Sequence, residues 1–228
     1  MSEENSNTIS VHRVMSRAKL TLKRINADIA AFKPVAIVRL ASADLIDHNG
    51  LFVAKNEADF KKTAKAQLDS ITQNLNNYFA LRCALLRSNS GAPADTQFTT
   101  IAVNDNLKLT VAEVIECRRT LTLVNDLVES IRNRRAEVLA KIAKTERQND
   151  VQLADSLAKV PNDALDTREN AVKYFTSING VKLVDPLDTL ALIEKYEQLI
   201  QQFADDVDVA LSESNASTKV NIEQVTLI

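Results

Sequence analysis

Two arginines, Arg82 and Arg135, fall on the apolar faces of helices that the sequence predicts. At about 100° per residue, each lies in line with aliphatic residues of its own helix. A guanidinium without a partner in an apolar interface costs several kcal/mol, so each arginine must meet a carboxylate, backbone carbonyls, a water-filled channel or an anionic ligand. The aligned residues are Leu68, Ile71 and Leu75 for Arg82, and Leu121, Val128 and Leu139 for Arg135.

Two interpretations of these arginines stay open. In the first, Arg82 and Arg135 form ion pairs between helices, or lie where a helix end has emerged from the core. In the second, they join Arg118 and Arg119 to line a pocket for a phosphate-bearing, nucleotide-like molecule, since guanidinium groups bind phosphates in a bidentate manner. The basic run at 132–135 lacks the interleaved aromatics of a nucleic-acid surface, so we do not expect nucleic acid as a partner.

The sequence carries no catalytic signature. His12 and His48 stand in separate segments without a metal-spaced partner, and no HExxH, CxxC, phosphate-binding Gly loop or nucleophile elbow occurs. The acidic run at 205–208 lies on a predicted helix, where successive side chains point in different directions, so it predicts a solvated face and no metal site. Cys117 is expected to be a small buried hydrophobe. We therefore expect no enzymatic activity, metal or cofactor.

The composition is that of a helical bundle. The 228 residues are 45% apolar but only 4% aromatic, and they include three Gly and four Pro. Charges nearly balance at 28 basic and 30 acidic residues, and the basic stretch 12–24 is expected to be a solvated helix face. Two cysteines give no disulfide framework, and neither a signal peptide nor a membrane-spanning run is evident. These features predict a cytoplasmic protein without a membrane partner.

Apolar periodicity and capping residues together predict five helices. Asn56 is a candidate N-cap, and Thr110 with Glu113 forms a capping box. Gly180 suits the left-handed position after a helix, while Asp185 and Pro186 suit the N-cap and first turn of the last helix. The expected helices span about 10–32, 57–86, 111–144 or beyond, 167–179 and 186–211.

Short strands complete the predicted fold. Residues 34–40 and 51–54 flank the Asn49-Gly50 turn, 98–109 reads as a hairpin, and 217–225 could pair with that hairpin. The fold class is mainly α: long antiparallel helices, as a bundle or coiled coil, with a small hairpin or three-stranded sheet at one end. Residues 1–9 are expected to be disordered, and 10–228 to form one helical domain that two helix-strand units, 10–109 and 110–228, could compose.

The segments LLRSN (85–89) and LSESN (211–215) both end a predicted helix before a Thr-rich strand. This recurrence suggests that two helical units deliver strands to one small sheet. Near that sheet we expect a polar cluster, with Arg82 about one turn below it. The expected cluster consists of Arg87, Asn89, Asn104 and Asn215.

Two stretches resemble known proteins. The run TVAEVIECRRTLTLVNDLVESI at 110–131, preceded by LLRSN, is similar to the central pattern of the septicolysin-like family of helical proteins. The run from Val184 to Glu223 resembles the C-terminal half of uncharacterised proteins of tailed phages. The resemblance implies a helical, phage-type protein and transfers no catalytic residue.

Two hypotheses of function follow. The first is a non-enzymatic, homo-oligomeric phage-type binding protein, which antagonises a host defence or regulatory process in the host cytoplasm by sequestering a nucleotide-like anion or a host protein. The second is a virion structural or assembly protein built from helical oligomers, in which the arginines pair with acidic residues across subunits. An enzyme would need a site assembled from residues far apart in the sequence.

Overall fold

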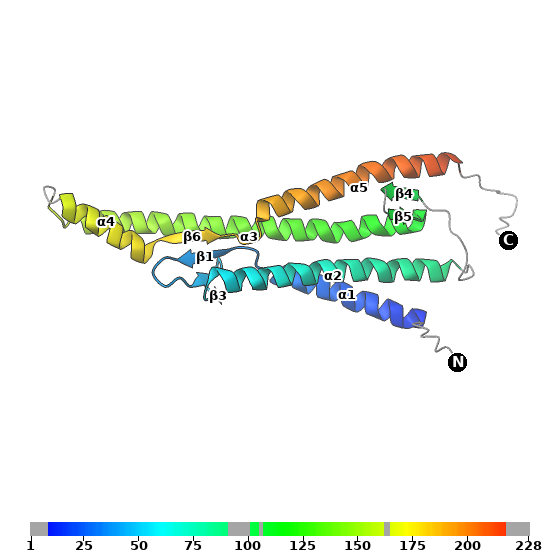
Figure 1. The fold of residues 1–228 in the computed structure, drawn as a ribbon, viewed down its shortest axis with the longest axis horizontal. Helices are drawn as coiled ribbons and strands as arrows, with labels where there is room; N and C mark the ends of the chain where they lie inside the picture. The colour runs from blue at the N-terminus through cyan, green and yellow to red at the C-terminus, as the bar shows by residue number, and fades with distance from the viewer. Residues whose placement is uncertain (1–8, 91–100, 105–106, 162–164, 218–228) are drawn as a thin grey trace, which may run out of the picture. The chain divides into compact units, whose positions relative to one another are not determined.

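The computed structural model describes residues 9–90, 101–104, 107–161 and 165–217, and it confirms a mainly α fold (Figure 1). No helix in this described part is long and apolar enough to cross a membrane. The expected disordered segment 1–9 lies outside the described residues except for Ile9. The helices are α1 (Val11–Ala31), α2 (Glu57–Asn89), α3 (Val111–Leu157), α4 (Leu165–Asn179) and α5 (Thr189–Ser217).

The chain divides into two compact units, each assembled from separate segments. The described residues of unit 1 come from 1–24, 74–125 and 196–228, and those of unit 2 come from 25–73 and 126–195. Helices α1, α2, α3 and α5 therefore each contribute residues to both units. Each unit also combines residues from both halves of the sequence.

Unit 2 contains a four-stranded antiparallel sheet. Its strands are β3 (Phe52–Ala54), β2 (Leu45–Ile46), β1 (Ala36–Arg39) and β6 (Val181–Val184), in that spatial order. Figure 1 shows β6 running beside β1, and the register pairs Ile37 with Leu183. The two predicted strands at 34–40 and 51–54 are present, but they do not pair directly, because β2 lies between them. The sequence did not predict β2, which has only two residues, or β6, which is stabilised by pairing with β1 from a distant part of the chain.

The β1 strand alternates its side chains between two buried faces of the sheet. Ala36 and Val38 pack with Phe60 of α2, whereas Ile37 packs with Val138 and Ile142 of α3. Since successive side chains of a strand point to opposite sides, the sheet of unit 2 is a middle layer between α2 and α3. This packing explains why the short strands are stable without long ladders.

Unit 1 contains the predicted hairpin. Strands β4 (Ile101–Asn104) and β5 (Leu107–Leu109) pair antiparallel, and Leu109 packs in a core with Val114 of α3 and Val207 of α5. The proposed third strand at 217–225 lies outside the described residues apart from Ser217, which belongs to α5.

The prediction that both Ser-Asn segments end a helix was wrong for the second segment. Helix α2 does end at Asn89, but α5 continues through Asn215 to Ser217. Serine and asparagine are less favourable than alanine in a helix by less than about 1 kcal/mol each, so they do not by themselves stop one. The side chains of Asn104 and Asn215 are outside the described part, so the expected cluster of polar residues stays a prediction.

Glycine has different roles at its two described turn positions. Gly50 follows Asn49 with φ of 83°, as the predicted turn requires. Gly180 was expected to adopt a left-handed conformation, but its φ is not positive. Instead its amide donates to the Thr176 carbonyl (2.9 Å), and a Cβ there would lie 2.5 Å from that oxygen and 2.6 Å from Leu40 Cδ1. Close packing at the end of α4, and not backbone conformation, requires glycine.

We predict that Gly180→Ala lowers the free energy of unfolding by about 1–3 kcal/mol, because the added methyl group meets a helix carbonyl that cannot move aside. Gly50→Ala is the matched control, since a Cβ there meets nothing within 4 Å and pays only for its positive φ, about 1 kcal/mol. Urea denaturation followed by circular dichroism measures both. An equal or smaller loss for Gly180→Ala would contradict the packing explanation.

Candidate functional site

In unit 1, Arg82 of α2 forms a bidentate ion pair with Glu116 of α3. The Nε–Oε1 distance is 2.8 Å and the Nη2–Oε2 distance is 3.1 Å. Glu116 is only 2% exposed, and Arg119 also approaches its Oε2 at 3.5 Å. Arg82, which needs a partner because it lies on an apolar helix face, thus pairs with a buried carboxylate of the same chain.

Glu113 lies one turn before Glu116 and is fully buried. Its Oε2 accepts from the Thr110 amide (2.9 Å), and its own amide donates to Thr110 Oγ1 (3.2 Å), which confirms the predicted capping box. Its Oε1 accepts from Arg87 Nε at 2.7 Å. The box therefore has a second role, which the sequence analysis missed: it holds a carboxylate against an arginine of α2. A spacing of three residues between Glu113 and Glu116 was the available signal.

Electrostatics keep both carboxylates ionised. The hydrogen bond from Arg82 lowers the pKa of Glu116 below its ordinary value and outweighs the effect of burial. Burial alone would raise the pKa of Glu113, but hydrogen bonds from the Thr110 amide, Arg87 and the Thr110 hydroxyl together lower it. The same pairing with Glu116 raises the pKa of Arg82. These groups are fixed charges at neutral pH and not proton donors or acceptors.

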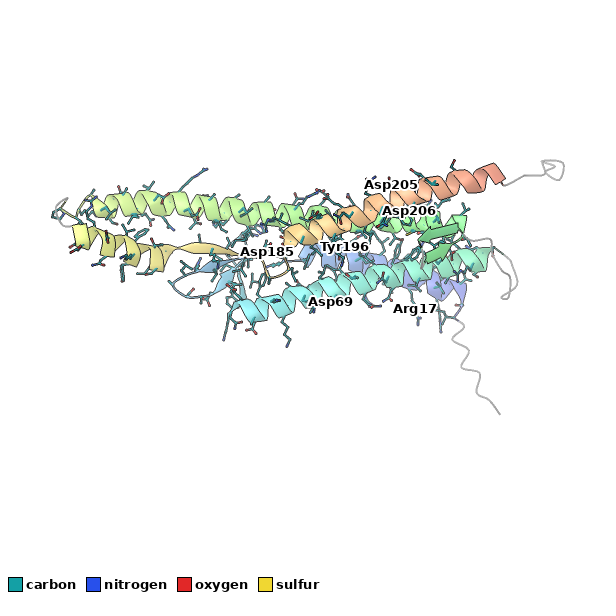
Figure 2. The ribbon with its side chains drawn as sticks, turned by 45° about the horizontal axis from the view of Figure 1, so that its top comes forward. Arg17, Asp69, Asp185, Tyr196, Asp205 and Asp206 are labelled. Carbon is teal, nitrogen blue, oxygen red and sulfur yellow. The ribbon has the colours of Figure 1, made fainter. Side chains whose placement is uncertain are left out.

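Arg118, which was also predicted to line the anion pocket, has a partner on another helix of unit 1. It pairs with Asp208 of α5, and both side chains are exposed. Asp205 accepts from Gln201 at 2.9 Å. Figure 2 shows Asp205 and Asp206 along α5, where Asp205 and Asp208 are exposed as expected of a solvated acidic face.

In unit 2, Arg135 meets the start of α5. Its Nη1 lies 2.5 Å from Asp185 Oδ2 and 3.0 Å from Thr189 Oγ1. Asp185, between β6 and α5 in Figure 2, also accepts from the amide and hydroxyl of the fully buried Thr189. The predicted helix start at Pro186 was wrong: α5 begins at Thr189, after Asp188 with φ of 49°. Asp185 therefore binds the first helical residue from outside the helix.

The four arginines of the predicted anion pocket are thus divided between the units, with Arg82, Arg118 and Arg119 in unit 1 and Arg135 in unit 2. Each has a carboxylate partner, and for Arg82 and Arg135 this agrees with the ion-pair interpretation. Their proposed contact with a ligand stays a prediction.

A second group of arginines lies on α1 in unit 1. Arg13, Arg17 and Arg24 are exposed, and within the described part of the chain none of them has an ion-pair partner. They share one side of the helix at about 100° per residue. No acidic residue occurs from 10 to 27, whereas five basic residues do. That imbalance was the signal that sequence analysis assigned to a solvated face.

A groove of about 550 Å³ runs beside these arginines. It lies between α1 and the part of α2 that belongs to unit 1. Its lining residues are Arg17, Leu20, Thr21, Arg24, Asn77, Ala80 and Leu81.

The two cysteines are poor nucleophiles. Burial raises the pKa of both the Cys83 thiol and the Cys117 thiol to about 11. Since the thiolate is the reactive form, both thiols are protonated and inert near neutral pH.

Comparison of the chain with protein-family models, curated proteins and solved structures found no match.

We predict that Glu116→Gln destabilises the fold by about 1–3 kcal/mol at neutral pH, because it leaves Arg82 without its charged partner. Since the pKa of Glu116 is lowered in the folded state, its contribution is present above the unfolded value and is lost as pH falls through the folded one. The variant should therefore lose less stability than the wild type as pH falls below about 4.5, the ordinary pKa of a glutamate.

Urea denaturation at several pH values measures this difference. Glu146→Gln, at an exposed position of α3, is the control and should change the free energy of unfolding by less than about 0.5 kcal/mol. An unchanged pH dependence in Glu116→Gln would contradict the assignment.

Proposed function

We propose that the protein is a non-enzymatic, homo-oligomeric binding protein of phage type. In this proposal it acts in the host cytoplasm and blunts a defence or regulatory process by sequestering a nucleotide-like anion or a host protein. The observation that carries the proposal is the row of arginines on α1, for which the described part of the chain supplies no carboxylate partner.

The allocation of charge within unit 1 supports an anionic partner. The arginines on α2 are neutralised by the buried carboxylates of α3, whereas the α1 row keeps its full charge at the surface. Arginines bind planar anions such as phosphates and carboxylates through two parallel hydrogen bonds. A positive surface without internal compensation also raises the rate at which an anion is captured.

The state of the buried reactive groups favours binding over catalysis. Glu113 and Glu116 are held ionised by structural partners, and Cys83 and Cys117 are held protonated by burial. A catalytic acid or base works best with a pKa near the operating pH, and a catalytic thiol needs a lowered one.

Isothermal titration calorimetry of the purified protein with nucleotides tests the ligand. We expect saturable heat with at least one phosphorylated nucleotide and none with the corresponding nucleoside, because the arginines recognise the phosphate. The affinity should fall as salt concentration rises, since the charges are exposed. The absence of heat with every nucleotide tried would remove the nucleotide version of the proposal.

Self-association is supported by apolar side chains that unit 1 leaves exposed. Val11 and Met15 are 41% and 46% exposed on α1, and Val111 and Ile115 are 36% and 45% exposed on α3. Each pair is four residues apart, so its members lie side by side on their helix. Such pairs are suited to burial against another copy of the chain.

We therefore expect light scattering at micromolar concentration to give a multiple of the single-chain mass. Ile115→Lys should reduce that mass without loss of helicity, because the position is exposed in one chain. The single-chain mass for the wild type would contradict self-association.

A further inference from the structure

We infer that the groove between α1 and α2 in unit 1 binds a ligand with two phosphate groups, such as a dinucleotide, and that Arg17 and Arg24 each hold one of them. This inference rests on the proposed function and adds to it a site and a ligand class.

The spacing of Arg17 and Arg24 suits two separate phosphate groups. Figure 2 shows Arg17 on α1, and both arginines line the same groove of about 550 Å³. They are seven residues apart, so their Cα atoms are separated by about 10.5 Å along the helix axis. Two arginines whose Cα atoms are this far apart can each bind a different phosphate, whereas a single phosphate would engage both only if their side chains converged.

The groove also offers apolar and polar side chains beside the two arginines. Leu20 is 57% exposed, and with Ala80 and Leu81 it gives the groove an apolar surface. Thr21 and Asn77 add polar side chains at the same place. Small-molecule sites of a few hundred Å³ combine such an apolar lining with a small number of polar groups. A nucleobase and a sugar therefore fit this lining better than a bare anion does.

Two grooves of unit 2 offer a contrast. One includes Lys33 and Arg134, but Lys33 Nζ lies 2.9 Å from Asp47 and Arg134 donates to Glu137 at 3.1 Å. A second groove there includes Arg134 together with the acidic residues Asp126, Glu129 and Glu137. An anion in either groove would have to compete with carboxylates that are already present. In the α1–α2 groove, none of the described lining residues is acidic.

Calorimetry with pApA, a dinucleotide carrying two phosphates, tests the inference. We expect the wild-type protein to bind it, and Arg17→Met and Arg24→Met each to weaken binding by about tenfold or more, since a lost charged hydrogen-bond pair has that effect. Arg17→Lys should restore part of the affinity, because it keeps the charge but not the planar fork. Arg147→Met should bind like the wild type, because Arg147 is an exposed arginine of α3 with no ion-pair partner among the described residues.

The other outcomes separate this inference from the proposed function. Binding of pApA that is unchanged in the Arg17→Met/Arg24→Met double variant would overturn the site while leaving a nucleotide-binding protein. Equal binding of inorganic phosphate or of a hexaglutamate peptide would overturn the two-phosphate class, because either would show recognition of negative charge alone. Circular dichroism of the variants, which change exposed side chains only, should match the wild type.

Discussion

Unit 1 depends on two carboxylates of α3 that are removed from water. Glu113 and Glu116 are 0% and 2% exposed, and such burial is tolerated only when each charge is paired and hydrogen-bonded. Arg87 and Arg82 of α2 supply the positive charges, while Thr110 supplies the capping hydrogen bonds. One pair of carboxylates thereby fixes the first turn of α3, the end of the hairpin before it and the facing side of α2.

Two pairs of arginines differ in their partners. Arg82 and Arg135 lie on apolar faces and are paired with carboxylates, so they contribute to the specificity of packing. Among the described residues, Arg17 and Arg24 have no such partner, and the groove that they border has no acidic lining residue. A ligand that displaced Arg82 would leave the buried Glu116 without its partner, whereas a ligand at Arg17 or Arg24 would break no ion pair between described residues. The arginines of α1 are exposed and lie where basic residues are in excess, whereas those on apolar faces are already paired. These differences favour α1 as the binding surface.

Local signals in the sequence predicted much of the fold and little of the candidate site. Thr110 and Glu113 form the expected capping box, and Asn56 caps α2 through the Asp59 amide at 2.8 Å, because both interactions span only three residues. The partner of Arg82 could not be predicted, since it lies 34 residues away and depends on how α2 packs against α3. Strand β6 was missed for the same reason: its stability comes from β1, at the other end of the sequence of unit 2.

The difference between these two pairs of arginines can be tested most directly by modifying the folded protein with phenylglyoxal. Mass spectrometry of its peptides after digestion then shows which arginines have reacted. We expect Arg17 and Arg24 to react rapidly and to be protected by pApA, while Arg82 and Arg135 react slowly whether or not the dinucleotide is present. Rapid modification of Arg82 and Arg135, with protection by the dinucleotide at those positions and not on α1, would contradict it.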